Sequence, residues 1–96
     1  MIRYKLRPGE VEHNLELLRV VYADLAAANP EGLRYGTFQL DDGVSFVAFT
    51  EFDDEPGAAA HHRLASFQDY RASLDERCEE PPVAHVLRDV GSFRFP

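Results

Sequence analysis

The stretch Leu33 to Phe52, LRYGTFQLDDGVSFVAFTEF, decides the fold, because it contains two strand-like runs and the turn that joins them. Thr37, Phe38, Val44 and Phe46 are among its many β-branched and aromatic residues, which suit a pleated sheet. Asp41-Asp42-Gly43 has the composition of a tight turn. We therefore predict a β-hairpin.

The register of this hairpin depends on its turn. A three-residue loop with Gly43 in the left-handed conformation would pair Leu40 with Val44, Phe38 with Phe46 and Gly36 with Ala48 on one apolar face. The other face would carry Tyr35 opposite Phe49, Thr37 opposite Val47 and Gln39 opposite Ser45. A two-residue turn would mix both faces, so the three-residue loop is the prediction. Neither face is plainly polar, so we expect both to be covered.

Periodicity supplies the other elements. Residues 2–7 alternate as a strand does, with Ile2, Tyr4 and Leu6 on one face. An amphipathic helix is predicted from Glu10 to Asn29-Pro30, and a second from about Ala58 to Cys78, which Glu79-Glu80-Pro81-Pro82 would end. A last strand is predicted over Val83 to Val90, with Gly91 to Phe95 as a possible continuation. The acidic run 53–55 is expected to cap the second helix.

The order β-α-β-β-α-β predicts an α+β, ferredoxin-like fold: one four-stranded antiparallel sheet with two helices on one face. The 96 residues are expected to form a single domain, 1–96. The opposite sheet face would expose either Tyr35, Thr37, Val47 and Phe49 or the row of Phe38 and Phe46. Because neither set suits water, we predict a homodimer packed sheet to sheet.

Composition excludes several classes of protein. The net charge of −7, from 17 acidic and 10 basic residues, disfavours nucleic acid and anionic membranes as partners. No apolar run is long enough to span a membrane, and the first residues lack the apolar core of a signal peptide, so a cytoplasmic location is expected. Cys78 is the one cysteine, which rules out an internal disulfide, and it is expected to be buried.

The segments YKLRPGEVEHNLELLR, FVAFTEFDDEPGAAAHHRLASFQDYRASL and VAHVLRDVGSF carry a family resemblance. A Pro-Gly follows the first strand, His61 precedes the aromatic Phe67 by six residues, and Tyr70 takes the next aromatic place. The chain resembles the antibiotic-biosynthesis-monooxygenase-like group of dimeric α/β barrels over nearly its whole length.

This resemblance implies a cleft between the sheet and helices of each subunit. The group includes cofactor-independent oxygenases of polycyclic aromatic substrates, haem-degrading enzymes and many proteins with no assigned role. The chain departs from both enzyme patterns. It has no tryptophan, which several of the oxygenases use, and its first strand carries Arg3, Lys5 and Arg7 where the haem-degrading enzymes keep an asparagine. No cofactor is expected.

His61 is the first candidate for chemistry, as a cleft residue that donates or accepts a proton or contacts a ligand; the alternative is a hydrogen-bonding residue on the helix surface. His62 is expected to face solvent, and two adjacent histidines do not form the i, i+4 pair that binds a metal.

Asn14 and Tyr70 are further catalytic candidates. Asn14 lies at the edge of a buried stripe, where it could hold either a strand end or a ligand. Tyr35, Phe49 and Phe67 are candidate ligand contacts, although aromatic residues at such spacings also build cores.

Arg3 and Lys5 are also candidate ligand contacts. If Ile2, Tyr4 and Leu6 pack under the helices, the basic row points into the barrel of the dimer, where unpaired cations are costly. We expect Glu51 or Asp89 to neutralise the row; the alternative is an anionic ligand inside the barrel.

Three functions remain open from the sequence. The first is a small-ligand-binding homodimer, which is either non-catalytic or weakly catalytic. The second is a cofactor-independent monooxygenase acting on an aromatic or polyketide-like substrate. The third is a structural interaction domain whose barrel is filled by side chains. Phosphate-binding loops, metalloprotease motifs and nucleophile elbows are absent from the sequence.

Overall fold

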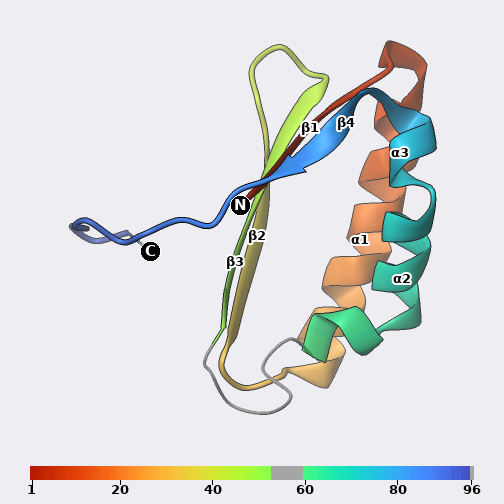
Figure 1. The fold of residues 1–96 in the computed structure, drawn as a ribbon. Helices are drawn as coiled ribbons and strands as arrows, with labels where there is room; N and C mark the ends of the chain where they lie inside the picture. The colour runs from red at the N-terminus through yellow and green to blue at the C-terminus, as the bar shows by residue number, and fades with distance from the viewer. Residues whose placement is uncertain (53–59, 96) are drawn as a thin grey trace.

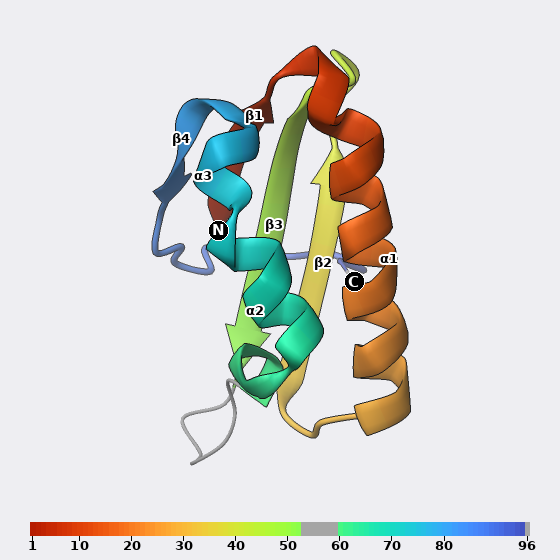
Figure 2. The same cartoon turned by 90° about the vertical axis from the view of Figure 1, so that its right-hand side faces the viewer.

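The structure is a computed structural model, which describes residues 1–52 and 60–95. β1 (Ile2–Leu6), β2 (Leu33–Gln39), β3 (Ser45–Phe52) and β4 (Cys78–Ala84) form one sheet in the order β2-β3-β1-β4. All three pairings are antiparallel. The helices cover one face of this sheet (Figures 1 and 2). The predicted ferredoxin-like, α+β fold is confirmed.

The helix α1 (Val11–Ala28) follows a short 3-10 turn, η1 (Pro8–Glu10). It buries Asn14, Leu18 and Val21 against the sheet, as its apolar spacing predicted. Asn29 ends it in the left-handed conformation, with φ 44°, and its backbone N–H donates to the carbonyl of Leu25 at 2.8 Å. The predicted stop at Asn29-Pro30 is confirmed, because a left-handed residue and the following proline both end a helix.

The hairpin exists, but its predicted register is wrong by one residue. The observed pairs include Gly36 with Phe49, Phe38 with Val47 and Gln39 with Phe46. Gly43 is left-handed as predicted, with φ 77°. The loop nevertheless holds four residues, 41–44, because Leu40 N–H donates to the carbonyl of Ser45 at 2.8 Å.

The Asp42 carboxylate explains the longer loop. Its Oδ1 accepts the backbone N–H groups of Val44 at 3.0 Å and Ser45 at 2.8 Å, and its Oδ2 accepts the Ser45 hydroxyl at 2.6 Å. These bonds hold Val44 in the turn. Since a one-residue slip moves each side chain to the other face, Phe38 and Phe46 lie on opposite faces rather than in one row.

The second helical region is also broken, contrary to the prediction of one helix to Cys78. It consists of the 3-10 turn η2 (Ala60–Arg63), α2 (Ala65–Ala72) and the short α3 (Leu74–Arg77). Leu64 is extended and Ser73 is not helical, which separates the three pieces. The start of the predicted helix and the acidic run expected to cap it lie outside the described residues.

The last strand begins earlier than predicted. β4 spans Cys78–Ala84 and includes Pro81 and Pro82, which were expected to lie before it. β4 is an edge strand that pairs with β1 alone, so its outward backbone groups need no ladder partner and prolines are tolerated. Residues 85–95 form no strand, so that part of the prediction is wrong.

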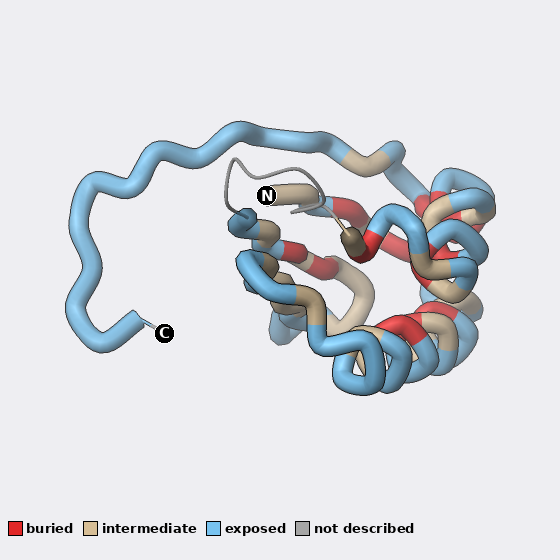
Figure 3. The backbone as a smooth tube through the Cα atoms, turned by 90° about the horizontal axis from the view of Figure 1, so that it is seen from below, coloured by how far each residue is buried: buried red, intermediate tan, exposed pale blue. Residues whose placement is uncertain are grey.

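The core lies between the sheet and the helices, where Leu6, Val21, Phe46 and Leu74 are at most 1% exposed (Figure 3). Cys78 is buried as expected, and burial raises the pKa of its thiol. We call the uncovered side of the sheet the open face; it includes Arg3, Lys5, Phe38, Val47, Phe49 and Val83. Among the described residues, no helix is long and apolar enough to cross a membrane.

Candidate functional site

A cleft opens between the helix-covered side of the sheet and the segment η2–α2. Its walls include Tyr4, Tyr35, His61, Phe67 and Tyr70. The cleft continues past the end of the sheet to the open face and to residues 86–95, and the whole concavity has a volume of about 2020 Å³. Phe67 and Tyr70 of α2 share the core cluster with Phe46 of β3, which fixes α2 over the sheet beside the cleft.

His61 is the most unusual group in this cleft. Its residue is 2% exposed, yet its Nδ1 has no hydrogen-bond partner among the described residues. Its ring stacks on Tyr35, with centroids 5.3 Å apart, and meets Phe67 edge-on at 4.8 Å. A buried polar atom without a partner is costly, so a position that keeps one is a candidate for ligand binding.

Burial also sets the charge of His61. Loss of solvent, and secondarily the neighbouring His62, lowers the pKa of His61 to about 4. The imidazole is therefore neutral near pH 7, and one of its nitrogens is an acceptor. His62 is exposed, as predicted, although its ring stacks on Phe67 at 5.2 Å.

Aromatic rings continue the wall from His61 toward α1. Tyr35 stacks on Tyr22 of α1 with centroids 5.4 Å apart, and the Tyr22 hydroxyl shares a 2.6 Å hydrogen bond with Thr37. Burial raises the pKa of Tyr35 well above its usual range, so it stays a neutral phenol. Flat rings with few polar atoms suit a flat, largely apolar ligand.

A buried polar network lies at the other end of the cleft. The Tyr4 and Tyr70 hydroxyls are 2.6 Å apart, and Asn14 Nδ2 donates to the Tyr4 hydroxyl at 3.0 Å. Arg77, 3% exposed, donates through Nε to Asn14 Oδ1 at 3.2 Å. Its other nitrogens donate to the Ser73 hydroxyl at 2.6 Å and the Tyr70 carbonyl at 2.8 Å.

This network is neutral except for Arg77. No carboxylate pairs with the Arg77 guanidinium among the described residues. Burial raises the pKa of both Tyr4 and Tyr70, so both hydroxyls remain protonated near pH 7. Tyr4 and Tyr70 both line the cleft, and their hydroxyls belong to a buried network that also includes Asn14 and Arg77.

The predicted site residues are only partly brought together. His61, Tyr70, Tyr35 and Phe67 all line the cleft, and Phe49 lines the same concavity from the open face. Asn14 lies behind the wall and reaches the cleft only through Tyr4.

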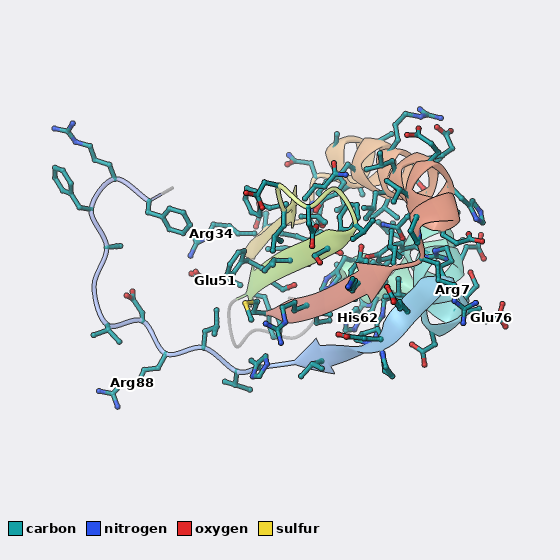
Figure 4. The ribbon with its side chains drawn as sticks, turned by 90° about the horizontal axis from the view of Figure 1, so that it is seen from above. Arg7, Arg34, Glu51, His62, Glu76 and Arg88 are labelled. Atoms are coloured by element: carbon teal, nitrogen blue, oxygen red, sulfur yellow. The ribbon has the colours of Figure 1, made fainter. Side chains whose placement is uncertain are left out.

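The basic row of β1 lies away from the cleft, on the open face. Lys5 Nζ lies 3.7 Å from a Glu79 carboxylate oxygen, and Arg7 donates to the Glu76 carbonyl at 3.2 Å. Glu51 pairs with Arg34 of the neighbouring strand instead of with this row (Figure 4). The Asp89 carboxylate accepts the Gly91 N–H at 2.9 Å. The expectation that Glu51 or Asp89 neutralises the row is therefore wrong for the single chain.

Tyr4 and Arg77 are site residues that the sequence reasoning missed. Tyr4 was expected to pack under the helices, and it does, but it also lines the cleft and shares a hydrogen bond with Tyr70. Arg77 lies one turn after Leu74 in the buried stripe. Two polar residues on facing buried stripes, Asn14 and Arg77, were the available signal, since each needs a partner.

Comparisons with known proteins agree with this architecture. The family model described as antibiotic biosynthesis monooxygenase matches residues 1–73. A Nitrosomonas europaea protein, described as a candidate antibiotic biosynthesis monooxygenase, superposes with a TM-score of 0.72 at 19% identity, covering 93% of this chain and 86% of its own. Rv0793 from Mycobacterium tuberculosis gives a TM-score of 0.65 at 21% identity, covering 94% of both chains. No curated protein matches the sequence.

Proposed function

Because the chain belongs to the antibiotic biosynthesis monooxygenase family, we propose that it binds a small, flat aromatic ligand in the cleft between the sheet and α2. The single observation that carries this proposal is the unpartnered Nδ1 of the almost fully buried His61. A ligand hydroxyl would satisfy that nitrogen. The rings of Tyr35 and Phe67 would then contact the ligand's flat faces and edges.

The polar end of the cleft adds a second contact to this proposal. The hydroxyls of Tyr4 and Tyr70 offer hydrogen bonds to an oxygen of the ligand, and Asn14 and Arg77 hold them in position. A site with one acceptor and one pair of hydroxyls, separated by an aromatic wall, favours a ligand with oxygens at both ends.

The pKa of His61 favours binding over catalysis. A general base works best when its pKa is near the working pH, and a pKa of about 4 makes His61 a weak base at pH 7. The group is better suited to accept a hydrogen bond than to remove a proton.

A cofactor-independent monooxygenase is the second candidate function, which family membership favours. In that reaction a phenol and O2 would yield a quinone and water: one oxygen atom enters the ring, the other leaves as water, and the substrate supplies the electrons. His61 would have to assist loss of the phenolic proton.

We also propose that the protein is a homodimer formed through the open face. Phe38 is 55% exposed there, Phe49 37% and Val83 45%, and exposed apolar side chains grouped on one sheet face favour a protein partner. A structural domain without a ligand stays a third candidate, which ligand titration tests.

The test uses 1-naphthol, which is aromatic, fluorescent and phenolic. We expect the full-length protein to bind it saturably, and His61→Ala to weaken binding by at least about tenfold, because a buried hydrogen bond is lost. His13→Ala is the matched control, since His13 is exposed on α1 outside the cleft and should leave the affinity unchanged. If the wild type and His61→Ala bind 1-naphthol with equal affinity, the ligand does not contact His61 and the proposed site is wrong.

An oxygen electrode separates the two functions. If the protein only binds, 1-naphthol causes no oxygen uptake above the rate without protein. Oxygen uptake accompanied by an equal amount of newly formed 1,4-naphthoquinone would favour the monooxygenase. That uptake should be lost in His61→Ala but not in His13→Ala.

A further inference from the structure

A buried chain of hydrogen bonds links α3 to the wall of the cleft. It runs from Arg77 of α3 through Asn14 of α1 and Tyr4 of β1 to Tyr70 of α2, and so joins the sheet to the helices that cover it (Figure 2). Each of the four residues is at most 3% exposed. Because solvent hardly reaches these bonds, the four groups themselves set the direction of each one.

Arg77 sets the orientation of the Asn14 amide. A guanidinium only donates hydrogen bonds, so the Asn14 atom that faces Arg77 Nε at 3.2 Å is the amide oxygen. The amide nitrogen of Asn14 then faces Tyr4 and donates to its hydroxyl oxygen at 3.0 Å. Bonds to the Ser73 hydroxyl and the Tyr70 carbonyl fix the guanidinium itself. Arg77 therefore makes the Tyr4 oxygen an acceptor on the side of Asn14.

One hydroxyl hydrogen of the tyrosine pair is left over. Each phenol has a single hydrogen to donate, and the 2.6 Å bond between Tyr4 and Tyr70 uses only one of the pair. The bond from Asn14 to Tyr4 uses a hydrogen of the amide. The described residues offer no further acceptor to either hydroxyl. Both tyrosines line the cleft, so a bound ligand is the available partner for that hydrogen.

Cooperativity assigns the remaining hydrogen to Tyr70. A hydroxyl that already accepts a hydrogen bond is a stronger donor, because successive bonds polarise one another. Tyr4 accepts from Asn14, so it is the better donor of the pair and donates to Tyr70. The hydrogen of Tyr70 is then free. A buried donor without a partner is costly, so a ligand oxygen that accepts it is stabilised.

We propose that Arg77 and Asn14 are positioning residues that make the Tyr70 hydroxyl a donor to the ligand, so that this end of the cleft prefers a carbonyl to a hydroxyl. This inference rests on the proposed ligand site and deepens it. A carbonyl oxygen accepts the Tyr70 hydrogen and brings no donor of its own. A ligand hydroxyl also accepts that hydrogen, but its own hydrogen then competes with Tyr4 for the Tyr70 oxygen.

Two ligands with one skeleton test this preference. 6-Acetyl-2-naphthol and its alcohol, 6-(1-hydroxyethyl)-2-naphthol, share the phenolic hydroxyl proposed to bind His61 and differ only in the oxygen at the far end. We expect the full-length wild type to bind the ketone at least about tenfold more tightly, as measured by fluorescence titration. The infrared carbonyl frequency of the bound ketone should also fall, because a hydrogen bond weakens the C=O bond.

Asn14→Asp reverses the chain. The carboxylate accepts from Arg77 and also from the Tyr4 hydroxyl, so Tyr70 donates to Tyr4 and has no hydrogen for the ligand. We expect the two ligands to bind within about twofold of each other, and the carbonyl frequency to stay unshifted. Asn29→Asp is the matched control, because it makes the same change at an exposed position outside the cleft and should keep the preference.

Two phenylalanine variants test the direction without a new charge. Tyr70→Phe removes the donor and should abolish the preference for the ketone. Tyr4→Phe leaves the Tyr70 hydrogen free, so the preference should remain. The opposite ranking of these two variants would show that the free hydrogen is on Tyr4 and would overturn the proposal.

The wild type alone separates this inference from the proposed function. If it binds both ligands equally, and His61→Ala weakens both, the ligand site stands and the inference is wrong. If it binds neither ligand, the proposed function and the inference fail together. A ketone preference that survives in Asn14→Asp and Tyr70→Phe also rejects the inference alone.

Discussion

His61 and Arg77 are two buried basic side chains of the site, and their surroundings differ. His61 is neutral, because loss of solvent lowers its pKa to about 4. Arg77 has all three of its guanidinium nitrogens hydrogen-bonded, to Asn14, Ser73 and Tyr70. His61 Nδ1 thus lacks a hydrogen-bond partner among the described residues, whereas each guanidinium nitrogen of Arg77 has one.

The low pKa of His61 predicts a loss of stability in mild acid. Between pH 6.5 and about 4 the unfolded chain binds a proton at this residue and the folded chain does not. Acid therefore favours the unfolded state, by on the order of 2 kcal/mol across that window. Urea unfolding at pH 7.5 and 4.5 should show a smaller difference in His61→Gln than in the wild type.

His13→Gln is the control for this measurement, because His13 is exposed and should leave the wild-type pH dependence intact. Parallel stability curves for the wild type and His61→Gln would mean that His61 is protonated in the folded state.

The engagement of Arg77 predicts a costly truncation. Arg77→Met removes the donors to Asn14, Ser73 and Tyr70, and we expect it to lower the free energy of unfolding by about 2–4 kcal/mol. Arg63→Met, at an exposed position of η2, should change it by less than about 0.5 kcal/mol. Chemical denaturation of both variants gives the comparison; equal small losses would show that the network is not stabilising.

At the scale of elements, periodicity was sufficient for the identity and order of the main strands and helices, but not for their ends. The hairpin was predicted with its left-handed Gly43, yet its register was not, because the bonds of one side chain, Asp42, place Val44 in the loop. β4 begins earlier than predicted, because Pro81 and Pro82 predict a break in the chain and lie within the strand instead. An edge strand accepts prolines, and which strand lies at the edge is a property of the assembled sheet.

Gly43 supplies the test at this scale. A Cβ added there meets no atom within 4 Å, so any cost of Gly43→Ala comes from its φ of 77° alone. We expect a loss of about 1 kcal/mol in the free energy of unfolding. Gly9→Ala is matched, since its Cβ also meets nothing and its φ is ordinary. Thermal unfolding that ranks the two variants equally would contradict the left-handed conformation of Gly43.

At the scale of the whole molecule, the candidate site could be predicted only in part. The family resemblance includes the spacing of His61, Phe67 and Tyr70, which made these three residues candidates from the sequence. Tyr4 and Arg77 were missed because their roles come from contacts between residues far apart in the chain, such as Tyr4 with Tyr70. The open face and its apolar residues were expected, but which residues compose it depended on the hairpin register.

Our central proposal is that the cleft binds an aromatic ligand at His61. The measurement that tests it most directly is a 15N NMR titration of the full-length protein, labelled at histidine, with 1-naphthol. We predict that one histidine of the four changes its ring-nitrogen shift in the direction of a hydrogen-bonded acceptor, and that this signal is the one missing from His61→Gln. If the His61 ring nitrogens do not respond at saturating 1-naphthol, the central claim is wrong.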